Sequence, residues 1–79
     1  MIDVKEAAIV AKDYLLALYD GRDIYNLTLE EVELSEDQEW WYITLGYSEI
    51  SGLRASNYKV IQIKSETGQV FSMKVRTLQ

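Results

Sequence analysis

The stretch that decides the fold is residues 57–77, Asn-Tyr-Lys-Val-Ile-Gln-Ile-Lys-Ser-Glu-Thr-Gly-Gln-Val-Phe-Ser-Met-Lys-Val-Arg-Thr. Apolar and polar residues alternate on both sides of a turn-forming segment, which is typical of two antiparallel strands with one buried face. The pattern predicts strands over Asn57–Lys64 and Val70–Thr77, joined by a short turn at Glu66–Gln69 in which Gly68 takes a positive φ. We therefore expect a β-hairpin here.

Two further strands are expected ahead of this hairpin. The run Glu39–Tyr47 is rich in aromatic and β-branched residues, which favour extended structure. Over Leu27–Leu34 the apolar residues change parity between Leu29 and Val32. This strand is therefore expected to contain a bulge near Glu30–Glu31.

Two connections follow from the positions of the small and polar residues. Ser35–Gln38 is polar and is expected to turn the chain between the first two strands. Ser48–Ser56 places small and polar residues around Gly52, and is expected to be a wide loop between the second and third strands. This loop is the only sizeable connection that the sequence offers for function.

A helix is expected from Asp3 to about Asp20. Asp3 is a plausible N-cap because Glu6 follows three residues later, as in a capping box. Gly21 allows the conformation that ends a helix, so Gly21–Asp23 should be a turn. At about 100° per residue, one arc of the helix faces the core: Val4, Ala7, Ala8, Ala11, Tyr14, Leu15 and Leu18.

A second apolar stripe lies opposite this arc. Ile2, Ile9 and Leu16 recur at intervals of seven residues among charged neighbours. A helix that covers a sheet on one side has no internal use for such a stripe. Two interpretations stay open, because single exposed aliphatic residues are common and because a continuous stripe can dock a partner.

These elements predict an α+β fold, with one N-terminal helix packed on a four-stranded antiparallel sheet in two layers, as one domain over residues 1–79. Alternation then assigns the side chains of the sheet to its two faces. Those expected to face the helix are Trp41, Ile43, Leu45, Ile61, Ile63, Phe71, Met73 and Val75. Those expected on the outer face are Trp40, Tyr42, Thr44, Tyr58, Val60, Gln62, Ser72, Lys74 and Arg76. A register error of one residue would exchange Trp40 with Trp41.

The composition excludes most catalytic classes. The 79 residues are 48% apolar and 27% charged, which is typical of a globular chain. The chain has no Cys and no His, which removes disulfides, thiolate nucleophiles, zinc ligands of the usual kind and histidine bases. We expect no enzyme activity and no cofactor.

The charges are distributed unevenly along the chain. Residues 1–52 carry twelve acidic and three basic residues, a net charge of −9, while residues 53–79 carry one acid and five bases, a net charge of +4; together these give −5. A chain with a pI near 4.5 is a poor candidate for nucleic acid, and strands that pair internally explain the asymmetry. Six acids between residues 30 and 39 lack the spacing of a calcium loop, so we expect a solvated strand face and no metal site.

The sequence predicts no membrane segment. No apolar run approaches the roughly 20 residues needed to span a bilayer. The segment Met1–Lys5 lacks the features of a secretory signal, so a cytoplasmic location is expected.

The order of elements resembles the PepSY domain. The likeness lies in Trp40–Ile43, in Tyr58–Ile63 and in the turn Glu66–Val70, since PepSY domains tend to end in a strand, a Thr-Gly turn and a strand. Lys64–Ser65 stand where PepSY members commonly carry an Asp. A helix wrapped by a curved antiparallel sheet is also similar to the cystatin-like arrangement, although the Gln-x-Val-x-Gly hairpin is missing. Either resemblance implies a non-catalytic binding or inhibitory module.

The expected function is therefore surface recognition of another protein or of a second copy of the chain. The candidate contact residues are Ile9 and Leu16 on the helix, Trp40, Tyr42 and Tyr58 on the outer sheet face, and Leu53 and Arg54 in the loop. Two alternatives stay open. The loop over residues 48–56 could block the active site of a target enzyme, and a small ligand could bind between the helix and the sheet, which requires a cavity there.

Overall fold

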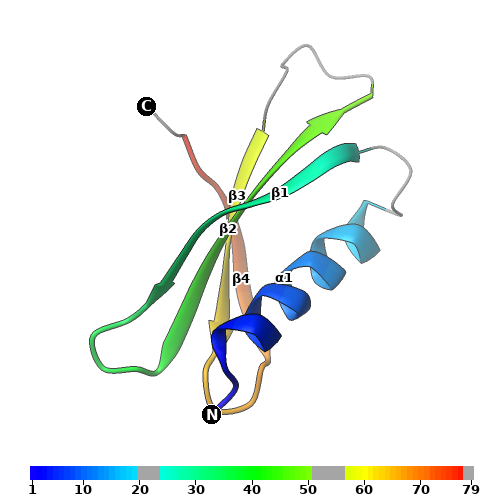
Figure 1. The fold of residues 1–79 in the computed structure, drawn as a ribbon. Coiled ribbons are helices and arrows are strands. Elements are labelled where there is room, and N and C mark those ends of the chain that lie inside the picture. The colour runs from blue at the N-terminus through cyan, green and yellow to red at the C-terminus, as the bar shows by residue number, and fades with distance from the viewer. Residues whose placement is uncertain (20–23, 51–56, 78–79) are drawn as a thin grey trace.

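The structure is a computed structural model that describes residues 1–19, 24–50 and 57–77. Its described elements are α1 (Val4–Leu18), β1 (Ile24–Leu34), β2 (Trp40–Glu49), β3 (Asn57–Lys64) and β4 (Val70–Val75). The strands form an antiparallel sheet in the order β1-β2-β3-β4, and α1 runs diagonally across one face of it (Figure 1). The predicted α+β fold is confirmed.

The first turn of α1 is capped as expected. Asp3 has extended backbone angles, and its Oδ1 accepts a hydrogen bond of 2.8 Å from the N–H of Glu6. A carboxylate in this position satisfies one free backbone donor and complements the helix dipole. The expected turn at Gly21–Asp23 lies outside the described residues. In the described part of the chain, no helix has the length and apolar composition that crossing a bilayer requires.

The buried stripe of α1 is narrower than expected. Ala7, Ala11 and Leu15 are fully buried, and the two small alanines allow the helix to approach the sheet closely. Three residues that were expected to face the core are exposed, and Ala8 is only half-buried; the exposed residues are Val4, Tyr14 and Leu18. The diagonal crossing explains the difference, because a helix lying across the strands contacts them through one line of residues.

The core lies between this stripe and the two central strands. Trp41, Ile43, Leu45, Ile61 and Ile63 are all buried, as the alternation predicts. Trp41 is therefore the inward tryptophan and Trp40 the outward one, and the expected register of β2 is confirmed.

Ile2 does not belong to the outward stripe of the helix, which corrects that expectation. Its side chain packs against the core, its N–H donates to the carbonyl of Ser65 at 2.7 Å, and its carbonyl accepts from the indole Nε1 of Trp41 at 3.1 Å. The physical reason is that α1 begins at Val4, so the helical wheel does not apply to Ile2.

Two residues of β4 are exposed where burial in the core was expected, and only Phe71 is also turned to the other face. Phe71 is 69% exposed, because the register of β3 and β4 shifts by one residue there and Val70 takes the inward place opposite Ile63. Val75 is 72% exposed, since it is the last residue of an edge strand. Met73 keeps its predicted place against the core.

The strand boundaries differ from the expected ones at four ends, of which the start of β2 at Trp40 instead of Glu39 is the smallest difference. β1 begins at Ile24 instead of Leu27, β2 continues through Ser48 and Glu49 where a loop was expected, and β4 ends at Val75 instead of Thr77. The predicted bulge in β1 is confirmed by a register shift between Leu29 and Glu31. A second shift lies between Tyr25 and Thr28, where Asn26 has a φ of 56°.

The turn between β3 and β4 has the expected glycine geometry. Gly68 has a φ of 80°, and its N–H donates to the carbonyl of Lys64 at 2.8 Å. The N–H of Lys64 donates in turn to the carbonyl of Gln69 at 2.8 Å. An L-residue would be strained at position 68, so the prediction of a positive φ there is confirmed.

Two neighbouring leucines test the assignment of the helix faces. Leu15→Ala should lower the free energy of unfolding by about 2–5 kcal/mol, because it opens a cavity in the core. Leu16→Ala should change it by less than about 1 kcal/mol, since Leu16 is 36% exposed. Urea unfolding followed by circular dichroism measures both values, and equal losses would contradict the assigned orientation of α1.

Candidate functional site

The outer face of the sheet is a surface that no described element covers. In the described part of the chain, α1 packs on the opposite face and no other element lies on this one. Pairing across the strands places the outer side chains in rows: Glu33, Tyr42, Gln62 and Ser72 in one, and Glu31, Thr44, Val60 and Lys74 in the next. We call this surface the outer face.

One end of the outer face carries an aromatic corner, formed by Trp40, Lys64 and Phe71. The rings of Trp40 and Phe71 are tilted at 56° with centroids 5.0 Å apart. The Nζ of Lys64 lies 4.7 Å from the centroid of the Trp40 ring and 3.6 Å from a carboxylate oxygen of Glu39. A hollow of about 530 Å³ opens beside these rings. Aromatic rings fixed in this way offer apolar contact area with little loss of side-chain entropy.

The turn before β2 fixes the position of Trp40, the first residue of that strand. The N–H of Trp40 donates to the hydroxyl of Ser35 at 3.0 Å, and its carbonyl accepts from the N–H of Ser35 at 2.9 Å. Gln38 closes the turn with a φ of 63° and donates to the carbonyl of Ser35 at 2.8 Å. Ser35 therefore ties the two ends of the turn together and positions the first aromatic residue of the outer face.

Asp37 completes this turn, and the hydrogen bonds that it accepts lower its pKa. The hydroxyl of Ser35 donates to Asp37 Oδ1 at 2.6 Å, and the N–H of Glu39 donates to the same oxygen at 3.0 Å. Both bonds favour the carboxylate, so they hold the pKa of Asp37 below its ordinary value of 3.8, with the serine hydroxyl as the larger cause.

Arg76 crosses the centre of the outer face. Its Nη1 donates to the hydroxyl of Thr44 at 2.8 Å and pairs with the carboxylate of Glu31 on the far edge strand. Thr44 is only 1% exposed, although it lies on the side of the sheet away from α1. A hollow of about 510 Å³ lies beside this pair and is also lined by Tyr42 and Val60. The arginine therefore links residues of non-adjacent strands.

A short chain of hydrogen bonds runs beside Arg76. The hydroxyl of Ser72 donates to Gln62 Oε1 at 3.1 Å, and Gln62 Nε2 donates to the hydroxyl of Tyr42 at 3.5 Å. These side chains connect β4, β3 and β2, so the position of Tyr42 depends on the strands beside it.

Tyr58 lies over a glycine on the next strand. Gly46 is the partner of Tyr58 in the ladder, and a Cβ at Gly46 would come within 3.1 Å of the Tyr58 ring and 3.0 Å of Thr28 Oγ1. The missing side chain therefore allows the aromatic ring to lie close to the strand.

The structure brings together only some of the predicted contact residues. Trp40, Tyr42 and Tyr58 share the outer face as expected, whereas Ile9 and Leu16 are exposed on the helix at the opposite side of the molecule. One flat partner surface cannot touch both groups. Leu53 and Arg54, together with residues 51–56 of the expected inhibitory loop, lie outside the described residues.

Sequence reasoning missed two features of the site. Phe71 was expected in the core because it shares parity with Met73 and Val75, although the apolar Val70 on the other parity is a signal of the bulge that turns Phe71 outward. The contact of Arg76 with Glu31 joins residues 45 positions apart, so only the strand order brings it into view. Among residues 1–19, 24–50 and 57–77, no three acidic side chains group closely enough to hold a metal ion.

Comparison of the chain with protein-family models, with curated proteins and with solved structures gave no match. The interpretation of the site therefore depends on its own residues.

The turn at Ser35–Glu39 gives a direct test of how the site is positioned. Ser35→Ala should raise the pKa of Asp37 toward 3.8, because the larger stabilising hydrogen bond is lost. Because folding lowers the pKa of Asp37, its carboxylate stabilises the fold at pH values above the ordinary pKa. This contribution is lost as the pH falls through the pKa of the folded state. Carboxyl NMR titration measures the pKa. Thr67→Ala in the other hairpin turn is the control and should leave the pKa of Asp37 unchanged. An unchanged pKa of Asp37 in Ser35→Ala would contradict the role given to the Ser35 hydroxyl.

Proposed function

We propose that the chain is a non-catalytic protein-binding module that recognises another protein through its outer face. The observation that carries this proposal is the aromatic corner beside Tyr42 and Tyr58 on a sheet face that no described element covers. Tryptophan, tyrosine and arginine are the residues most enriched at the centres of protein interfaces.

The rigidity of the outer face supports the same function. Trp40 is fixed by Phe71, Lys64 and the turn at Ser35, while Tyr42 is bonded to Gln62. Side chains that are already ordered lose little conformational entropy when a partner binds. Arg76, Lys64 and Glu33 place charges around the aromatic residues, in the manner of a polar rim around an apolar centre.

The helix stripe is a separate surface and is not part of this proposal. Ile9 is 51% exposed and Leu16 is 36% exposed, and both face away from the sheet. Exposed aliphatic residues of this kind are normal on small domains. The stripe therefore serves as an internal comparison for mutations of the outer face.

We keep the PepSY-like and cystatin-like resemblances as proposals. A helix followed by four strands in sequential order, with a glycine turn between β3 and β4, is compatible with both. Either relationship would fit a non-catalytic binding role, which the outer face supports independently.

Matched variants of the two surfaces test the proposed function. A chain that carries a photo-crosslinking side chain in place of Tyr42, and no other change, should capture one protein in cells that express the chain. Adding Trp40→Ala should reduce that capture at least tenfold, equivalent to about 1.4 kcal/mol. Leu16→Asp should leave it unchanged. Circular dichroism checks that both variants fold.

Three outcomes would contradict this proposal. Loss of capture in Leu16→Asp alone would move the interface to the helix. Unchanged capture in Trp40→Ala would remove the aromatic corner from the interface. A dimer in analytical ultracentrifugation that dissociates in Trp40→Ala would show that the outer face binds a second copy of the chain.

A further inference from the structure

β4 is an edge strand, and no described strand pairs with its free side. The sheet order places β4 and β1 at the two edges, and among the described residues β4 pairs only with β3. A free edge presents backbone donors and acceptors that an additional strand can use.

The hydrogen-bond pattern identifies which groups point outward. The N–H of Arg76 donates to the carbonyl of Tyr58 at 3.0 Å, so these two residues form a hydrogen-bonded pair. Antiparallel pairing alternates, and Lys74 and Ser72 are therefore bonded to β3 as well. The N–H and carbonyl groups of Met73 and Val75 point to the free side, where a fifth strand would meet them.

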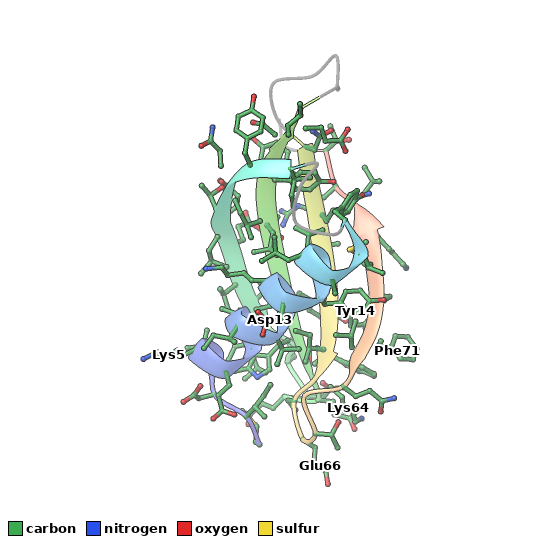
Figure 2. All side chains as sticks on the ribbon, turned by 90° about the vertical axis from the view of Figure 1, so that its right-hand side faces the viewer. Lys5, Asp13, Tyr14, Lys64, Glu66 and Phe71 are labelled. Carbon is green, nitrogen blue, oxygen red and sulfur yellow. The ribbon has the colours of Figure 1, made fainter. Side chains whose placement is uncertain are left out.

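Two highly exposed apolar side chains lie at the same edge. Val75 and Phe71, at 72% and 69%, are the most exposed large apolar residues of the described strands. Phe71 belongs to the outer face, whereas Val75 pairs with Lys59 on the side of α1. Figure 2 shows Phe71 projecting from the β4 edge and Tyr14 on the side of α1 nearest to β4. A strand added here would cover apolar surface on both sides of the sheet.

The two edges of the sheet have opposite charge and different regularity. β1 carries Glu30, Glu31 and Glu33 without a basic residue, and two register shifts interrupt its ladder. β4 contains Lys74 and no acid, whereas the side chain of Arg76, which follows it, is paired with Glu31 across the sheet. The β4 edge therefore favours a partner with negative charge, while β1 is shielded by its bulges and carboxylates.

We propose that β4 accepts an extended segment of another protein in which acidic and apolar residues alternate, added as a fifth strand. Its acidic side chains would lie beside Lys74 on the outer face, and its apolar side chains would lie beside Met73 and Val75 on the side of α1. Main-chain hydrogen bonds supply affinity in such complexes, and the alternating side chains supply specificity.

A second copy of this chain fits the edge less well. Two β4 strands related by a twofold axis bring the Lys74 residues of both copies to one short strand pair, where like charges are unfavourable. Pairing of β4 with β1 of another copy meets the register shifts near Asn26 and Glu30. Like charges oppose pairing of β4 with another β4, and the bulges oppose pairing of β4 with β1. A segment of a different chain is therefore favoured.

An eight-residue peptide of alternating Glu and Val, blocked at both ends, is the probe. Titrated into the ¹⁵N-labelled chain, it should shift the amide signals of Met73 and Val75, and the matched Lys-Val peptide should bind at least tenfold more weakly. Lys74→Glu should weaken binding of the Glu-Val peptide several-fold, because it replaces an attraction with a repulsion.

Val75→Pro is the decisive variant. The N–H of Val75 points away from β3, so proline there removes an outward donor and leaves the ladder to β3 intact. Val75→Pro should weaken binding at least tenfold, and Val75→Thr, which keeps the N–H, should bind within about threefold of the wild type. Circular dichroism checks that the variants fold.

Four results would overturn the inference. These are the absence of binding to wild type, equal binding of the Lys-Val peptide, unchanged binding in Val75→Pro, and a wild-type dimer that Val75→Pro dissociates. The inference goes beyond the outer-face function and does not depend on it, since it rests on the outward backbone groups of Met73 and Val75 and on Lys74. Failure at the edge would accordingly leave the proposed function standing.

Discussion

One helix covers one face of the sheet, and the rest of the structure depends on this constraint. The contact is made by Ala7, Ala11 and Leu15, which lie four residues apart and are completely buried. The two small alanines let α1 lie close to β2, and Leu15 completes a core with Ile43 and Ile61. No element in the described part of the chain covers the other face of the sheet, so that face must be stabilised by its own side chains.

Cross-strand contacts provide that stabilisation. Arg76 reaches over Thr44 to Glu31, and Gln62 connects Ser72 with Tyr42, so polar side chains tie all four strands together on the uncovered side. Exposed pairs of this type each contribute little to the free energy of folding. Their effect is mainly to order the surface, which is the property that a recognition face requires.

Local patterns predicted the elements, and contacts between distant residues were harder to predict. Alternation placed Trp41 inward and Trp40 outward, and the change of parity in β1 located a bulge that the register confirms. The outward turn of Phe71 escaped, because Val70 and Phe71 are both apolar and either could take the inward place before Met73. The wheel misplaced Ile2, since a periodicity argument has no information about where a helix begins. Predicting the partners of Arg76 requires knowledge of the strand order, which no local sequence pattern contains.

The chain's two tryptophans have a spectroscopic consequence. Trp41 lies in the core with its indole bonded to the carbonyl of Ile2, whereas Trp40 sits half-buried on the outer face. Adjacent in sequence, they report on different events. Emission from Trp41 follows disruption of the core and release of the N-terminal segment, and emission from Trp40 follows changes at the surface. A single-tryptophan version of each kind would thus separate folding from recognition without an added label.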